Sequence, residues 1–220
     1  MPRTSTRDHA GEARVTAAEL AHVIVPLDGS DESGRAVPVA RQLAALLGAD
    51  LTFLGVATPG MDRGALQVLL EEAAVPVGGE LTVAVVDGKD GVAPAIAAVG
   101  VQLPRHVVCM ASHGRGRAAG LVGSVATGLA AAAREPLVVV GPEVPVGHYL
   151  AGRLVACVDG SMRSEAGLPT MAAWARSLRL AMTLVTVAEP IPAPVTPGAP
   201  YRRTHGPSMG AEDYVEGLVR

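Results

Sequence analysis

The sequence predicts an α/β fold, a doubly wound parallel sheet with helices on both faces. Three observations lead to this prediction. Short apolar runs alternate with single helical segments along residues 20–143, and strands that are hydrophobic throughout are typical of a parallel sheet buried on both faces. Polar, glycine-containing turns follow the first and the fourth of these runs. The pattern then restarts after a proline-containing linker, which predicts a partial repeat of the same fold.

The first strand is predicted at residues 22–27 and ends in the polar turn of residues 28–31. Ser30 and Ser33 can cap the helix that follows. The apolar positions of this helix recur on one face: Ala36, Ala40, Leu43, Ala44 and Leu47. Pro38 lies near its start, where a missing N–H is best tolerated. The pattern therefore predicts one helix that continues to Gly48.

The remaining elements of the first domain follow in regular alternation. Strands are predicted at residues 51–57, 81–86, 105–111 and 136–140, and helices at residues 62–74, 92–101 and 122–134. Together with the first strand they make a five-stranded domain over residues 20–143. Residues 1–19 are polar and unpatterned, which is typical of a flexible tail.

A second copy of the first strand, helix and strand follows the predicted linker of residues 144–152. Asp159 repeats Asp28 at an offset of 131 positions. The same offset relates Ser164 to Ser33, Pro169 to Pro38, Leu178 to Leu47, Thr183 to Thr52, Val187 to Val56 and Pro190 to Pro59. One offset that holds without a gap through three elements indicates a tandem repeat.

This second repeat, residues 153–220, is predicted to be incomplete. Its proline-rich stretch leaves room for one more helix, at residues 209–219. The apolar face of its first helix, with Trp174 and Leu178, is expected to pack on the first domain or on a second chain.

Composition excludes several classes of partner. The net charge of −3 gives no electrostatic basis for binding DNA or an anionic membrane. Aromatic residues make up only 2%, too few for a surface that stacks single-stranded nucleic acid. No segment has the length of a membrane span, and the N-terminus lacks a signal-peptide core. Cys109 and Cys157 both lie in apolar strand-like runs, so we expect buried thiols in a reducing cytoplasm.

The run from Val107 to Arg117 followed by Gly123 and Ser124 predicts an anion site. A strand leads into a glycine-rich basic loop and then into a helix, and exposed N–H groups with a helix N-terminus favour a phosphate. Gly114, Gly123 and Ser124 are expected to hold phosphates through N–H groups and the hydroxyl. Arg115 or Arg117 would assist, or alternatively would lie on a solvated loop.

Asp28 follows the first strand, and its turn faces the same crevice if the first and fourth strands are neighbours. Its carboxylate would accept a hydrogen bond from a base or ribose. The alternative is that Asp28 is a turn residue that caps the next helix, and the two roles are compatible. His113 is expected to order the loop rather than act as a general base, since no nucleophile is evident beside it.

These motifs resemble the universal stress protein family. The resemblance rests on residues 25–33, 111–114 and 123–126 and on the strand at 136–140. It implies a Rossmann-like sheet in the order 3-2-1-4-5, similar to adenine nucleotide alpha hydrolases. ATP-binding members carry Gly, two residues, Gly, nine residues, Gly and Ser or Thr.

Carried onto this sequence, the resemblance makes Gly114 the second glycine of the motif, with Gly123 and Ser124 as its final pair. It makes Val56 a wall of the adenine pocket. Ala111 replaces the first glycine, and eight residues rather than nine precede Gly123. The predicted nucleotide site comprises Pro26, Leu27, Asp28, Val56, Met110, Ala111, His113, Gly114, Arg115, Gly123, Ser124 and Val125.

The leading functional hypothesis is a cytoplasmic stress-response protein that binds ATP or a related adenine nucleotide, with or without Mg²⁺, as a regulatory ligand. One alternative is a scaffold of the same fold that binds no nucleotide. The other is weak ATP hydrolysis, for which no paired carboxylates or positioned base are evident. Because an apolar edge strand invites pairing, residues 136–140 are expected to form a homodimer or an intrachain domain contact.

Overall fold

The computed structural model describes residues 19–74, 81–114, 122–132, 135–144 and 150–187. The predicted tail apart from Glu19, the basic residues Arg115 and Arg117, and the predicted helix at 209–219 lie outside these residues. No helix within the described ranges is both long and apolar enough to cross a membrane.

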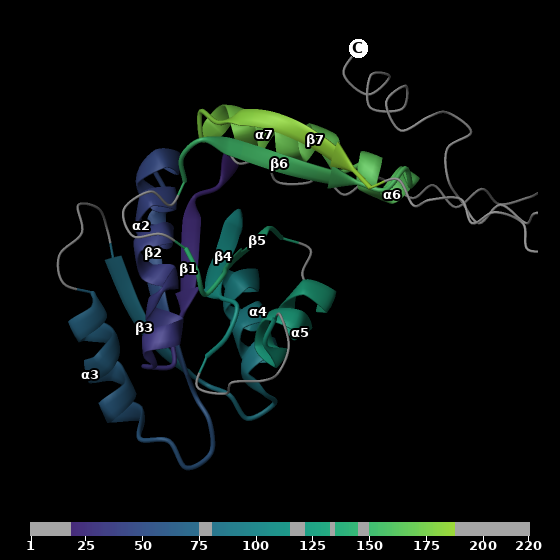
Figure 1. The fold of residues 1–220 in the computed structure, drawn as a ribbon. Helices are drawn as coiled ribbons and strands as arrows, with labels where there is room; N and C mark the ends of the chain where they lie inside the picture. The colour runs from purple at the N-terminus through teal and green to yellow at the C-terminus, as the bar shows by residue number, and fades with distance from the viewer. Residues whose placement is uncertain (1–18, 75–80, 115–121, 133–134, 145–149, 188–220) are drawn as a thin grey trace, which may run out of the picture.

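Five parallel strands form the first sheet, in the predicted order β3-β2-β1-β4-β5 (Figure 1). The strands are β1 (His22–Pro26), β2 (Asp50–Ala57), β3 (Leu81–Asp87), β4 (His106–Ala111) and β5 (Leu137–Val140). Val23 of β1 lies between Leu51 of β2 and Val107 of β4. The first and fourth strands are therefore neighbours, and the turns that follow them share one edge of the sheet.

Helices cover both faces of this sheet (Figure 1). They are α1 (Asp31–Gly34), α2 (Ala36–Leu47), α3 (Arg63–Ala73), α4 (Val92–Gln102) and α5 (Ser124–Ala132). Leu43 of α2 and Leu66 of α3 belong to one buried cluster, and Ile96 of α4 and Leu129 of α5 to the cluster on the opposite face. The doubly wound α/β architecture is confirmed.

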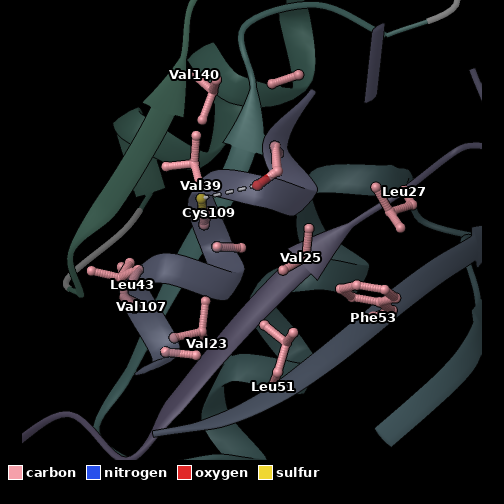
Figure 2. Packing of buried hydrophobic residues seen from close by; sticks show 14 of the residues in the cluster. Val23, Val25, Leu27, Val39, Leu43, Leu51, Phe53, Val107, Cys109 and Val140 are labelled. Atoms are coloured by element: carbon pink, nitrogen blue, oxygen red, sulfur yellow. Dashed lines mark hydrogen bonds between the residues drawn. The ribbon is translucent and has the colours of Figure 1, made fainter. Parts of the chain in front are cut away.

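The larger cluster is built from alternate residues of the central strands. Figure 2 shows Val23 and Val25 of β1 beside Phe53 of β2, with Cys109 of β4 against α2. The Cys109 thiol lies 4.0 Å from the Ala36 carbonyl oxygen. Burial raises the pKa of this thiol to about 12, because the apolar surroundings disfavour the thiolate. Cys109 is the buried structural thiol that its strand position predicts.

The helix after β1 is not continuous, which corrects the sequence prediction. It is divided into α1 and α2 at Arg35. Proline has no N–H, so Pro38 cannot donate to the carbonyl of Gly34 four positions earlier. The missing bond falls between the two helices, and the apolar spacing that predicted one helix is insensitive to it.

A second, two-stranded parallel sheet contains β6 (Arg153–Val158) and β7 (Ala181–Thr186), with α6 (Met162–Glu165) and α7 (Leu168–Ser177) between them. It lies beyond the amino-terminal end of β1 (Figure 1). Leu178 is buried in the larger core cluster of the first sheet, and Trp174 packs against that cluster. The Leu150 N–H also donates to Gln42 Oε1 at 2.9 Å. The apolar helix face is therefore covered by the first domain.

The turn after β6 reproduces the turn after β1. Ser161 N donates to Asp159 Oδ1 at 2.9 Å, as Ser30 N donates to Asp28 Oδ1 at 3.0 Å. Gly160 and Gly29 both have φ of 78°. Hydrogen bonds from Ser161 and Ser164 lower the pKa of Asp159 to about 2. This local geometry agrees with a partial repeat of the fold.

Cys157, in contrast, is exposed, so the prediction of a second buried thiol is wrong. It lies on the face of the β6–β7 sheet opposite α7. An apolar strand indicates burial only when both of its faces are covered, and the described residues cover one.

The end of α7 offers a direct test of backbone strain in the second repeat. Arg179 has φ of 55°, whereas Gly48 takes the equivalent left-handed position after α2. Because a side chain is disfavoured there, Arg179→Gly is expected to stabilise the protein by up to about 1 kcal/mol. Thermal unfolding followed by the fluorescence of Trp174 measures this. Gly48→Ala, which meets no atom within 4 Å, is the matched control and should destabilise by a similar amount; equal melting temperatures for all three proteins would contradict the strain.

Candidate nucleotide-binding site

A cavity of about 560 Å³ lies at the carboxyl ends of β1 and β4. Its lining comes from three strand ends, from the start of α5 and from α4. The lining residues are Pro26, Leu27, Asp28, Ser33, Leu54, Val56, Thr58, Met61, Val92, Ile96, Met110, Ala111, Ser112, His113, Gly114, Gly123, Ser124, Val125 and Ala126. In an open α/β sheet this is the point where ligands bind, because the connections from neighbouring strands leave in opposite directions.

The structure brings together every predicted site residue that it describes. Strands β1, β2 and β4, the loop after β4 and the start of α5 all contribute predicted residues to this one cavity. Arg115 lies outside the described residues. Most of the wall is aliphatic, and Asp28 is the one carboxylate among the described lining residues.

Asp28 is both a turn residue and a wall of the cavity. Its Oδ1 accepts hydrogen bonds from the Ser30 N–H at 3.0 Å and from the Ser30 hydroxyl at 2.6 Å. The Ser30 hydroxyl oxygen in turn accepts from Ser33 N at 3.2 Å and so caps α1. Oδ2 lies against Gly114, only 2.7 Å from where a Cβ on that residue would be. The cap of α1 is therefore Ser30 and not Asp28. Asp28 combines a turn role with its position in the cavity, and the turn fixes the direction of the carboxylate.

The predicted phosphate cradle needs one correction. The Gly123 N–H donates to the Ser112 carbonyl at 2.6 Å, so this donor is already used within the protein. Gly123 instead acts as the residue before α5, and its carbonyl accepts from Thr127 N at 2.9 Å. A Cβ on Gly123 would lie 3.0 Å from the Ser112 oxygen. The glycine is needed for the close approach of two chain segments.

The donors that can serve an anion belong to the first turn of α5. The N–H groups of Ser124, Val125 and Ala126 precede the first residue that can donate within the helix, and all three residues line the cavity. The positive end of the helix dipole and the Ser124 hydroxyl add to them. This end of the cavity is suited to one or more phosphate oxygens.

The loop after β4 is fixed by its own hydrogen bonds. Ser112 is buried, and its N–H donates to the Val140 carbonyl at 2.8 Å. The Ser112 hydroxyl lies 3.0 Å from His113 Nδ1. This contact agrees with a loop-ordering role for His113.

Several lining residues were not among those predicted. Leu54 precedes Val56 by two positions, so strand alternation alone places both on one face. Thr58 and Met61 belong to the connection after β2, and Val92 and Ile96 to α4. No sequence pattern places these four residues in the cavity, because their position depends on the order of the strands in the sheet.

The sheet order and the position of the cavity define the chain as an open, doubly wound α/β protein with a ligand-sized site at its topological switch point. The chain belongs to the universal stress protein family, since the model of that family matches residues 19–141. A search of the curated proteins finds no match.

Several solved structures match parts of this chain. A universal stress protein crystallised in complex with cAMP is 26% identical, with 56% of this chain and 97% of that chain covered and a TM-score of 0.47. Universal stress protein UspA from Lactobacillus plantarum is 20% identical, with 58% and 99% covered and a TM-score of 0.44. A functionally unknown protein from Pseudomonas aeruginosa PAO1 is 13% identical but has a TM-score of 0.61 over 77% of this chain and 62% of that chain. This last likeness shows a shared fold.

Proposed function

We propose that the cavity binds ATP or a related adenine nucleotide, and that this ligand regulates the protein in a cytoplasmic stress response. The observation that carries the proposal is that the described residues of the predicted site converge in one cavity of about 560 Å³. Membership of the universal stress protein family supports it. Turnover of the nucleotide is not part of the proposal.

The two ends of the cavity suit the two ends of a nucleotide. Val56, Ile96 and Met110 offer apolar walls to the flat faces of a base. The first turn of α5 offers N–H donors and the Ser124 hydroxyl to phosphate oxygens. Asp28, held by Ser30, is a fixed acceptor for a base amine or a ribose hydroxyl. A ligand that binds one conformation of the protein more tightly than another would raise the population of that conformation, and so change which partners the protein binds.

Calorimetric titration of the full chain with ATP tests the proposal. We expect saturable binding with a dissociation constant below millimolar, with weaker binding of GTP, which presents no exocyclic amine at the same ring position. Inorganic triphosphate alone is the control for the phosphate end. No heat of binding and no thermal stabilisation at millimolar ATP would reject the proposal.

The same titration tests whether ATP binding requires Mg²⁺. In place of the contact with a base or ribose, the Asp28 carboxylate, the one carboxylate among the described lining residues, would hold a hard cation that also binds phosphate oxygens. If Mg²⁺ accompanies the nucleotide there, adding EDTA weakens ATP binding to the wild type but not to Asp28→Asn. Equal affinities with Mg²⁺ and with EDTA in the wild type would show that the cation is dispensable.

We also propose that two copies pair through the edge of β5. Within the described residues β5 is hydrogen-bonded only to β4, and Val139 is 40% exposed. Lysine on an edge strand opposes pairing because it must be desolvated. Val139→Lys is therefore expected to convert a dimer to a monomer in sedimentation equilibrium. Val101→Lys, at an 84% exposed position on α4, is the control; a Val139→Lys dimer as tight as the wild type would contradict this interface.

A further inference from the structure

No described residue covers one face of the β6–β7 sheet. Arg153 donates to the Thr183 hydroxyl at 3.1 Å at one end of this face, and the rest of the face is apolar. We define the open face as Val155 and Cys157 of β6 together with Val185 and Val187 at β7. Val155 is 54% exposed, Val185 38% and Val187 82%, and Cys157 is exposed. Cys157 pairs with Val185 in register, so these side chains form one patch.

The equivalent face of the first sheet indicates which kind of element packs on such a surface. At the offset of 131 positions, Ile24, Leu54 and Val56 are the equivalents of Val155, Val185 and Val187. Their exposures are 0%, 0% and 8%. The residues that cover them come from helices, namely Ile96 of α4 and Ala126 and Leu129 of α5. By this equivalence, the open face is suited to helices that present small and aliphatic side chains.

The opposite face of the same sheet is less able to take another helix. α7 already packs on β6 and β7 there. In the first repeat the neighbouring helix α3 approaches at Gly55, where a Cβ would lie 2.8 Å from Leu70 Cδ1 and 2.9 Å from Leu66 Cδ2. The second repeat has Thr186 at the equivalent position. Its side chain fills the space that the close approach of α3 requires.

We propose that residues 209–219 of the same chain pack on the open face as an amphipathic helix. Residues 188–220 lie outside the part of the chain that the structure describes, and they start directly after Val187, at the edge of this face. Ala211, Tyr214, Val215 and Leu218 recur at i, i+3, i+4 and i+7, which gathers them on one helical face. The acidic residues Glu212, Asp213 and Glu216 lie on the other.

The covalent connection between β7 and residues 209–219 favours this segment over a separate molecule as the partner of the open face. Residues 188–208 join Val187 to the segment, and an extended chain of that length reaches about 70 Å. The open face is about 20 Å long at six residues per strand. A covalent link of about 20 residues gives an effective concentration in the millimolar range, so even a small apolar contact is populated.

Cys157 provides the test, because its thiol lies on the open face. In the full chain we expect slow alkylation of Cys157 by iodoacetamide. Leu218→Asp would place a charge in the apolar contact and is expected to raise the rate about ten-fold, which corresponds to about 1.4 kcal/mol of docking. Glu216→Gln, on the polar side of the same helix, is the matched control and should leave the rate within about two-fold. The buried Cys109 serves as an internal standard that stays unreactive in all three proteins.

Two outcomes would overturn the proposal. In the first, Cys157 of the wild type reacts as fast as the thiol of the unfolded chain, and Leu218→Asp changes nothing. In the second, Cys157 of a Val139→Lys protein, whose β5 edge cannot pair, is protected in proportion to protein concentration and the mass doubles over the same range, which assigns the face to a second copy. Protection that is independent of concentration and lost only in Leu218→Asp supports the intramolecular helix.

Discussion

Replacing Phe53 with alanine is expected to lower the free energy of unfolding by about 3–5 kcal/mol. Phe53 is the only phenylalanine in the chain and is fully buried. It pairs in register with Val25 of β1 and Val83 of β3 and belongs to the larger core cluster (Figure 2). Strands on both sides are hydrogen-bonded in place, so the surroundings cannot collapse into the space that the ring leaves. Urea denaturation followed by circular dichroism measures the loss.

Two variants bracket this prediction. Val68→Ala changes a residue on α3 that is 53% exposed, and should alter the free energy of unfolding by no more than about 0.5 kcal/mol. Phe53→Leu keeps most of the volume and should cost less than about 1.5 kcal/mol beyond the lost aromatic surface. A Phe53→Ala protein within about 1 kcal/mol of the wild type would mean that the residues around Phe53 can collapse into the space that the ring leaves.

The alternation of elements could be predicted because each element carries its own local signal. Apolar runs such as residues 107–111 are long enough for a strand and too short for a helix, and glycine or proline bounds them. The order of the strands is different, since any right-handed arrangement of β-α-β units satisfies the same local pattern. The resemblance to a family implies the order 3-2-1-4-5, and the structure confirms it.

The site could be predicted at the level of residues but not of individual hydrogen bonds. Asp28 and Gly114 are marked by polar turns that follow apolar strands. The pairing of Gly123 N with the Ser112 carbonyl depends on how closely the loop returns to its own start, and no spacing in the sequence encodes that distance. Thr58 and Met61 likewise enter the cavity only because β2 lies beside β1.

Burial in the second repeat shows a further limit. β1 and β6 have similar apolar sequences, yet Ile24 is fully buried and Val155 is 54% exposed. The difference does not lie in the strands. β1 has β4 on its second edge and α4 and α5 on its second face, whereas β6 pairs only with β7 among the described residues. The composition of a strand predicts which side chains are apolar. Whether those side chains are buried depends on the strands and helices that pack around them.

Replacing Gly114 with valine is expected to weaken ATP binding by about 10- to 100-fold, if the cavity is the nucleotide site as proposed. The new Cβ would lie 2.7 Å from Asp28 Oδ2, so the carboxylate has to move. It cannot swing freely, because Ser30 holds its other oxygen with two hydrogen bonds. A hydrogen bond to a charged group contributes about 1.5–3 kcal/mol, and losing it accounts for the expected change in affinity.

Gly141→Val is the matched control for this substitution. A Cβ at Gly141 meets no atom within 4 Å, and the residue does not line the cavity. Both variants should remain folded by circular dichroism, and only Gly114→Val should lose affinity in the calorimetric titration. If the wild type binds ATP and Gly114→Val binds it equally well, the nucleotide occupies a different surface, because no ligand in this cavity can be indifferent to the position of Asp28.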